Sequence, residues 1–156
     1  MLSHIDEKGQ PRMVDVGEKP MSRRSARARA LIHIPDEVAM LIRDGALRTQ
    51  KGPVFHTAII AGVMAAKKTS ELIPFCHPIG LDDCQVEITL PEPDRIQIDC
   101  VVSVYGKTGV EMEAMTGASV AALTVYDMCK AASHGIVIQE IRLMEKRGGR
   151  SDYAVR

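Results

Sequence analysis

The chain has 156 residues and no tryptophan, and aromatic residues make up only 3% of it. Stacking platforms for single-stranded nucleic acid are built from aromatic side chains, so their shortage argues against this class of partner. Lysine plus arginine and aspartate plus glutamate each total 20, which gives a formal net charge of zero. Proteins that bind nucleic acid or anionic membranes carry a basic excess, so this balance argues against both.

Long apolar runs and paired cysteine motifs are also missing. The longest uninterrupted apolar segment, 58–66, is too short to span a bilayer, which takes ~20 residues. The four cysteines form no CxxC pair, which argues against a zinc knuckle or a thioredoxin-type motif and favours reduced thiols. The polar segment 1–10 does not have the apolar centre of a secretory signal. We therefore expect a soluble, cytoplasmic protein.

The chain contains no internal repeat or long linker, so we predict one domain over 1–156. Residues 1–22 contain four Gly or Pro residues and no sustained period, which predicts an extended N-terminal arm. We place the core at 23–146 and a flexible C-terminal tail at 147–156.

Hydrophobic periodicity predicts the elements of the core. The apolar run 30–34 predicts a short strand, which follows a cluster formed by Arg23, Arg24, Arg27 and Arg29. Helices are predicted from Pro35 to Gly45, from 53 to 69 and from 110 to 133. Alternation over 86–90 and 96–104 predicts a hairpin with its turn at 91–94, and a last strand begins at Ile136.

This order predicts an α+β protein with a ferredoxin-like (split βαβ) antiparallel sheet and helices on one face. The other face of such a sheet would expose apolar side chains, so we expect self-association to cover it.

Asp127 and Lys130 lie three residues apart on one helix face. They form either an ordinary surface ion pair or, if partly buried, an acid/base pair with shifted pKa values. Lys51 precedes Gly52-Pro53 at a helix start, where a lysine is usually solvated. Spacing alone does not decide between these alternatives.

A second candidate region is the turn Lys107-Thr108-Gly109, which leads into a helix and presents free backbone N–H groups to an anion. The bland alternative is that Glu111 and Glu113 are ordinary first-turn acids, and no P-loop sequence is present. His77 lies in a proline-stiffened loop, where it is either a general acid/base or a structural histidine. Together with the arginine cluster at 23–29 and the basic run Lys146-Arg147-Gly148-Gly149-Arg150, these features suit an enzyme that acts on a phosphorylated small molecule.

Five segments carry a family resemblance: MVDV at 13–16, KG at 51–52, LIPFCHP at 72–78, KTGVEMEA at 107–114 and AALTVYDMCK at 121–130. In this order and spacing, the chain resembles the molybdenum-cofactor biosynthesis protein C family, the cyclic pyranopterin monophosphate synthases, over about residues 3–152. The resemblance implies a ferredoxin-like fold and a homohexamer, built as a trimer of dimers with active sites at the dimer interface. It also implies a lyase that converts the 3′,8-cyclised GTP intermediate to cyclic pyranopterin monophosphate and releases pyrophosphate.

The resemblance also implies most of the site residues, to which the residue patterns add proton transfer by His77 and anion binding at Thr108 and Gly109. Asp127, Lys51, Lys130 and His77 are the predicted catalytic groups. The predicted substrate-binding residues are Phe75, Cys76, His77, Met112, Glu113, Glu111, Arg24, Lys146, Thr108 and Gly109. No protein-bound metal or cofactor is expected, because the reaction has no redox step, although Mg²⁺ could accompany the substrate phosphates.

The sequence departs from the family pattern in a few places. Phe75 stands where leucine is usual, and Gly117, where alanine is usual, is expected to weaken its helix by up to ~1 kcal/mol. The tail, 147–152, also diverges. Two other function classes are compatible with part of this pattern: a small-molecule sensor, which needs no acid/base pair, and a metal hydrolase built on Cys76 and His77, for which further ligands are missing.

Overall fold

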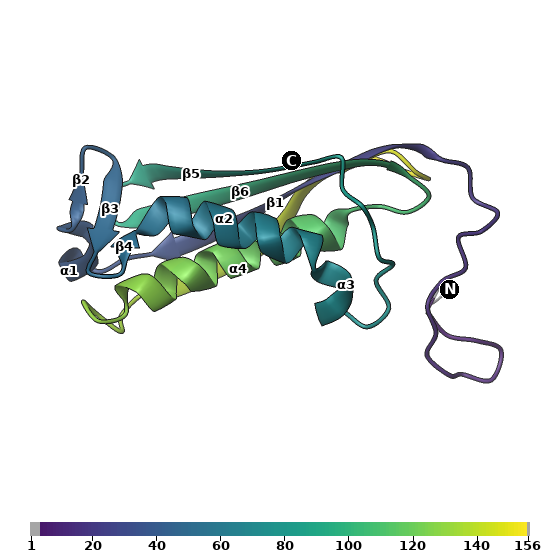
Figure 1. Ribbon diagram of the computed structural model, residues 1–156, viewed down its shortest axis with the longest axis horizontal. Coiled ribbons are helices and arrows are strands. Elements are labelled where there is room, and N and C mark those ends of the chain that lie inside the picture. Colours follow the sequence, from purple (N-terminus) through teal and green to yellow (C-terminus); the bar gives the residue numbers. More distant parts are fainter. Residues whose placement is uncertain (1–3, 156) are drawn as a thin grey trace.

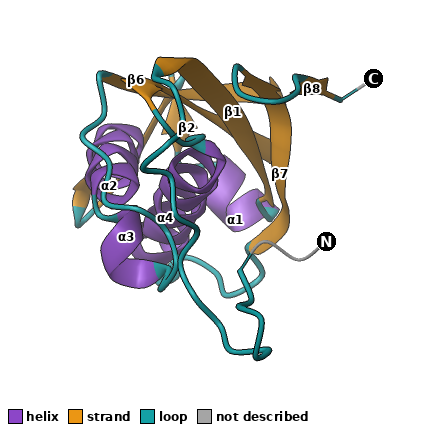
Figure 2. Cartoon of the chain, turned by 90° about the vertical axis from the view of Figure 1, so that its right-hand side faces the viewer, coloured by secondary structure: helices purple, strands orange, loops and turns teal. Residues whose placement is uncertain are grey.

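The computed structural model describes residues 4–155 and contains one long, curved antiparallel sheet. Its strands are ordered β5-β6-β1-β7-β8. They are β5 (Asp83–Glu92), β6 (Arg95–Gly106), β1 (Ser22–His33), β7 (Val137–Arg147) and β8 (Tyr153–Ala154). Helices α2 (Val54–Lys67) and α4 (Glu111–Cys129) pack side by side on one face (Figures 1 and 2). The predicted ferredoxin-like arrangement is confirmed.

The central strand β1 is longer than the sequence predicts. It starts at Ser22 rather than at residue 30 and therefore includes the arginine cluster. Ala26, Ala28 and Ala30 alternate with these arginines and are buried beneath the helices. The period-two signal was present, but small alanines between arginines made it look like a solvated charge run.

The first predicted helix is wrong beyond its first turn. Only α1 (Asp36–Ala39) is helical, and a small sheet follows, made of β2 (Ile42–Arg43), β3 (Ala46–Thr49) and β4 (Gly52–Pro53). Asp44 and Gly45 both have positive φ, 51° and 73°, and they form the two-residue turn between β2 and β3. An Asp-Gly pair is a strong hairpin signal, and here it outweighs the helical stripe.

The remaining elements are close to prediction. Helix α2 occupies most of the predicted 53–69 segment and is followed by the short α3 (Thr69–Leu72). Helix α4 ends at Cys129, four residues before the predicted end. The hairpin is confirmed, but its strands extend further, so the turn shrinks to Pro93 and Asp94. Residues 1–3 and 156, at the ends of the predicted arm and tail, lie outside the described residues.

The two long helices approach each other at Gly62 and Gly117. A Cβ on Gly62 would lie 3.0 Å from the Gly117 carbonyl oxygen, and a Cβ on Gly117 would lie 2.6 Å from Sγ of the buried Cys100. At Gly117, α4 therefore needs a residue without a side chain in order to pack against α2 and β6. The sequence-based view of Gly117 as a mere weakness of its helix misses this packing role.

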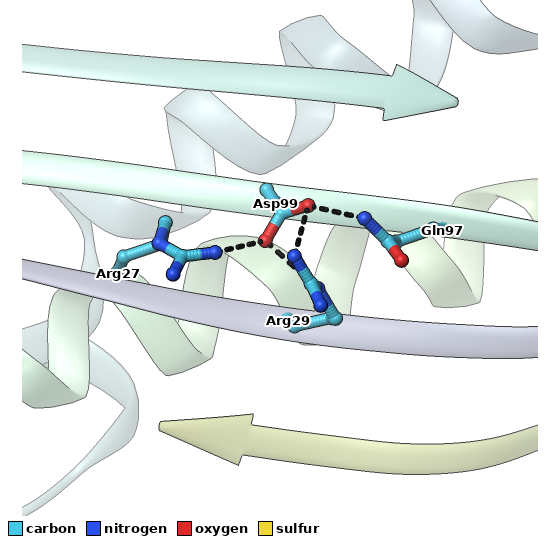
Figure 3. Close-up of polar contacts among 4 residues, drawn as sticks. All are labelled: Arg27, Arg29, Gln97 and Asp99. Atoms are coloured by element: carbon cyan, nitrogen blue, oxygen red, sulfur yellow. Dashed lines mark hydrogen bonds and ion pairs between the residues drawn. The ribbon is translucent and has the colours of Figure 1, made fainter. Parts of the chain in front are cut away.

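The sheet face opposite the helices is polar at its centre, so the expected exposed apolar face is present only in part, at Val101 and Tyr105 of β6 and Val137 of β7. Asp99 of β6 accepts hydrogen bonds from Arg27 Nη1 at 3.2 Å, Arg29 Nε at 3.0 Å and Gln97 Nε2 at 2.8 Å (Figure 3). Further exposed apolar side chains lie on the helices, at Ile60, Met64 and Leu123. No helix within residues 4–155 is long and apolar enough to cross a membrane.

Candidate active site

A cavity of about 1000 Å³ opens at the N-terminal end of α4. Its lining comes from the N-terminal arm, the start of β1, the loop after α3, the turn before α4, the first turn of α4, and the end of β7 with the residues that follow. All ten predicted substrate-binding residues lie in its wall: Arg24, Phe75, Cys76, His77, Thr108, Gly109, Glu111, Met112, Glu113 and Lys146. They come from separate parts of the chain, and the sheet order explains why they meet, because β1 lies between β6 and β7.

One side of the cavity is strongly basic. Arg24 is fixed by a hydrogen bond from its Nε to the Gly106 carbonyl oxygen, at 3.0 Å. Lys146 lies 3.2 Å from Glu111 in an ion pair, and Arg147 and Arg150 also line the wall. Guanidinium and ammonium groups gathered in this way can bind phosphate oxygens.

The basic side depends on two glycines that the sequence did not single out for this purpose. Gly148 and Gly149 have φ values of 85° and 81°, and a Cβ on Gly148 would lie 2.3 Å from the Arg23 carbonyl oxygen. Only glycine permits this close approach of the tail to β1. The contact brings Arg147 and Arg150 to the cavity, and neither was among the predicted site residues. Their only sequence signal was their place in a basic run.

Glu113 is the most deeply placed acid of the cavity. It is 4% exposed although it is a carboxylic acid. Burial is the main cause that raises its pKa above the ordinary value, and the nearby Glu111 raises it further. The pKa of the neighbouring Cys76 thiol is also raised, by burial and then by Glu113. This part of the cavity therefore favours neutral groups.

His77 is already engaged in a contact. Its Nε2 lies 2.7 Å from the Val14 carbonyl oxygen. A carbonyl oxygen can only accept, so Nε2 must carry a proton and donate. Nδ1 is the ring atom that remains for any contact with a ligand, and the catalytic role predicted for His77 stays a prediction.

The other predicted catalytic residues gather at the opposite end of α4. Lys51 Nζ lies 2.8 Å from Asp127 Oδ2 and 3.0 Å from the Asp127 carbonyl oxygen, and Lys130 Nζ lies 2.8 Å from Asp127 Oδ1. The sequence brings Lys51 here because the β3–β4 turn ends beside the last turn of α4. We call these three residues the carboxylate–lysine cluster.

The cluster is exposed and fully charged in the single chain. The Asp127 side chain is 55% exposed. Hydrogen bonds from Lys130 and Lys51 lower its pKa to about 2. Asp127 in turn raises the pKa of Lys130. Of the two alternatives left open by the sequence, mutual stabilisation of charged forms is the one that this geometry favours.

The cavity and the cluster do not meet within one chain. Glu113 and Asp127 lie fourteen residues apart on the same straight helix, which places them about 21 Å apart along its axis. Figure 1 shows the two ends, with the arm and the loop after α3 at one and β4 at the other. The predicted site residues therefore form two groups rather than one.

Within residues 4–155, no three His, Cys, Asp or Glu side chains are grouped as metal ligands would be. All four cysteines are free thiols.

Fold and cavity together define the class: a ferredoxin-like α+β protein with a small-molecule cavity rich in cationic side chains. A comparison with protein-family models identifies the particular family. The MoaC family model matches residues 13–149, and the chain belongs to this family. The resemblance stated from the sequence is thereby confirmed.

The chain is also similar to curated proteins over nearly its whole length. It is 53% identical over 151 residues to a cyclic pyranopterin monophosphate synthase of Xanthomonas campestris pv. campestris (strain B100), which covers 97% of this chain and 92% of the relative. It is 53% identical over 150 residues to cyclic pyranopterin monophosphate synthase 1 of Mycobacterium tuberculosis (strain H37Rv), covering 96% and 87% respectively.

Proposed function

We propose that this protein is an enzyme that forms cyclic pyranopterin monophosphate, in molybdenum cofactor biosynthesis, from the 3′,8-cyclised GTP intermediate with release of pyrophosphate. The observation that carries this proposal is the match to the MoaC family and its named synthases over nearly the whole chain. The cavity supports it independently, because its volume suits a nucleotide and its basic side suits a polyphosphate.

The basic side of the cavity is the part suited to the phosphates. Expulsion of pyrophosphate while a cyclic phosphate closes builds negative charge on phosphate oxygens. Arg24 and Lys146, with Arg147 and Arg150, are placed to stabilise that charge. Lys146 must exchange Glu111 for a phosphate oxygen, because the two side chains are paired in the free protein.

The carboxylate–lysine cluster is the part suited to proton transfer. Ring opening and ring closure both need protons to be moved. Asp127, with its lowered pKa, is a carboxylate at neutral pH, and Lys130, with its raised pKa, is an ammonium. In the free protein Lys130 is therefore a proton donor, and Asp127 holds both lysines in place. Desolvation by bound substrate or by a second subunit would push the pKa values of Asp127 and Lys130 toward neutrality.

We further propose that a complete site joins the cavity of one subunit to the cluster of another. The cavity lacks the carboxylate–lysine cluster and the cluster lacks the phosphate-binding groups, and about 21 Å of α4 separates the two. In a two-fold dimer with antiparallel α4 helices, the cavity of each subunit would lie beside the cluster of the other, which gives two complete sites. This supports a homo-oligomer, for which the family resemblance implies a trimer of dimers. The exposed Ile60, Met64 and Leu123 offer apolar surface for such contacts.

The reaction needs no protein-bound redox cofactor, since none of its steps is an oxidation or a reduction. Mg²⁺ bound to the substrate phosphates is compatible with the proposal. We also propose that the enzyme acts in the cytoplasm, where nucleotide substrates are made.

The test is to supply the 3′,8-cyclised GTP intermediate to the purified protein and to measure pyrophosphate and the pterin product, with and without EDTA. Stoichiometric formation of both products is expected. EDTA should lower the rate only through free Mg²⁺, so that added Mg²⁺ restores it. Binding of the intermediate without turnover would instead identify a sensor and contradict the proposal.

A further inference from the structure

The N-terminal arm, residues 4–20, forms a loop that extends past the end of the sheet (Figure 1). Its own hydrogen bonds are local: Ile5 and Pro11 form an isolated bridge, and Asp6 accepts from the backbone N–H groups of Lys8 and Gln10. None of residues 4–20 is buried. The arm is therefore a preformed loop without a hydrophobic core of its own, which makes it a low-stability element.

Side chains of the body hold the arm at a few points. His77 donates from Nε2 to the Val14 carbonyl oxygen at 2.7 Å, and Lys107 donates from Nζ to the Gly17 carbonyl oxygen at 2.7 Å. His4 stacks on Phe75 with ring centroids 6.4 Å apart. Across residues 4–155, the hydrogen bonds between arm and body come from side chains of the body alone.

The held segment forms one wall of the cavity. Val14, Asp15 and Val16 line it beside His77, and Lys19 lines it further along. Both hydrogen-bonded carbonyl groups, on Val14 and Gly17, belong to this lining stretch. Release of these contacts would remove a wall of the site without disturbing the core.

We propose that the arm is a lid over the cavity and that His77 is a positioning residue that latches it through the Nε2–H donor. The identity of the natural ligand in this inference rests on the proposed function, whereas the latch itself does not. The contact engages Nε2 in both the neutral and the charged ring, because imidazolium also donates from Nε2. A general acid/base role would need the other ring nitrogen, Nδ1, so the latch and the catalytic alternative use different atoms of His77.

The first measurement uses the free full-length protein and follows trypsin cleavage after Arg12, at the edge of the held stretch, by mass spectrometry. Loss of one hydrogen bond to a docked carbonyl should speed cleavage by about tenfold in His77→Leu and in Lys107→Met. His77→Gln should restore protection, because its amide N–H can replace Nε2–H. Lys8→Met is the matched control, since Lys8 is on the arm but is not an anchor, and it should cleave after Arg12 like the wild type. Unchanged cleavage in both anchor variants would overturn the latch, and so would a Gln variant that cleaves like the Leu variant.

The second measurement tests the lid, with the 3′,8-cyclised GTP intermediate as the probe. His77→Leu and Lys107→Met should raise KM by about tenfold with a smaller loss of kcat, and His77→Gln should reverse the rise in KM. Faster cleavage with an unchanged KM would overturn the lid. A Gln variant that keeps the arm protected but loses kcat as fully as the Leu variant would make His77 a catalytic residue and overturn the positioning role. If the wild type itself fails to turn over the intermediate, the proposed function fails while the cleavage result still decides the latch.

Discussion

The two ends of α4 each present a carboxylic acid, and their surroundings push the pKa values apart. Glu113, near the N-terminal end, is 4% exposed, and burial raises its pKa. Asp127, near the C-terminal end, is 55% exposed, and two lysines lower its pKa to about 2. Opposite shifts of this kind often separate groups with different roles in a site. One end offers a neutral, enclosed cavity wall, and the other offers fixed charges.

The contrast also shows what each end lacks. The cavity end has phosphate-binding groups and enclosure but not the carboxylate–lysine cluster. The cluster end is open to solvent, where charged groups interact only weakly. We therefore propose that catalysis requires the two ends of α4 from different subunits, with each end completing the other.

The largest effect is expected at the cluster end. Asp127→Asn should lower turnover by roughly 10²–10⁴-fold, because the amide can neither accept a proton nor hold both ammonium groups. Pyrophosphate release measures this loss, with circular dichroism as a check on the fold. Asp94→Asn is a matched control: Asp94 is also an exposed carboxylate near a basic group, 3.4 Å from His33, but lies outside both parts of the site. Asp127→Asn activity above a tenth of the wild type would remove Asp127 from the chemistry.

Lys51→Arg separates charge from proton transfer at the same end. Arginine keeps the positive charge but does not deprotonate in proteins. We expect the variant to bind the cyclised nucleotide within about tenfold of the wild type yet to lose nearly all turnover. Single-turnover rates and separately measured affinities decide the point. Normal turnover would reduce Lys51 to an electrostatic clamp, and lost binding would make it a substrate anchor.

The two acids should give opposite pH dependence of stability. For Glu113 the folded pKa is raised, so its neutral form stabilises the fold fully below the ordinary value of 4.5, and this stability is lost as pH rises through the folded pKa. For Asp127 the folded pKa is lowered, so its contribution is present above 3.8 and is lost as pH falls towards about 2.

Urea unfolding across pH measures both contributions. Glu113→Gln should flatten the fall in unfolding free energy on the alkaline side of pH 4.5, and Asp127→Asn should flatten the fall on the acid side of pH 3.8. If Glu113→Gln altered only the acid side of the stability curve and Asp127→Asn only the alkaline side, the assigned environments of the two acids would be wrong.

The smallest effect on activity is expected between the two ends, at Gly117, which sets the contact of α4 with α2. Gly117→Ala should destabilise the fold by about 1–3 kcal/mol, because the added methyl group meets Cys100 Sγ and the Gly62 carbonyl oxygen. Activity of the folded fraction should change little, because neither end is altered. Pairing Gly117→Ala with Cys100→Ala should recover part of the stability. Stabilisation by Gly117→Ala alone would show that helix propensity outweighs this packing.

Local patterns were enough to predict most of the fold. Alternating residues in 86–104 and helical periods in 53–69 and 110–133 act over a few neighbours, so the hairpin, α2 and α4 could be predicted. Two local signals compete with a second pattern in the same segment: the Asp44-Gly45 turn with a helical stripe, and the alternation of alanine with arginine in β1 with an apparent solvated charge run. In both segments the structure follows the first pattern.

The site was harder because its geometry is long-range. Family motifs identified the residues around 75–77 and 107–113, which do line the cavity. No local pattern shows that Val14 and Asp15 are held against it by His77, or that two positive-φ glycines bring Arg150 to its basic side. The sequence also does not show that the cluster and the cavity are separate, because this depends on α4 being one uninterrupted helix from 111 to 129.

Subunit mixing tests most directly whether each active site combines two chains. Asp127→Asn disables the cluster and Lys146→Ala disables the cavity, so oligomers of either variant alone should be nearly inactive. When the two are co-expressed with different tags, the account predicts recovery to about a quarter of wild-type turnover, because half of the dimers are mixed and each has one intact composite site. A chain with both substitutions, mixed with wild type, should give no active mixed dimer. Failure of the two single variants to complement, together with half-active mixed dimers in this control, would place the whole site within one chain and contradict the account.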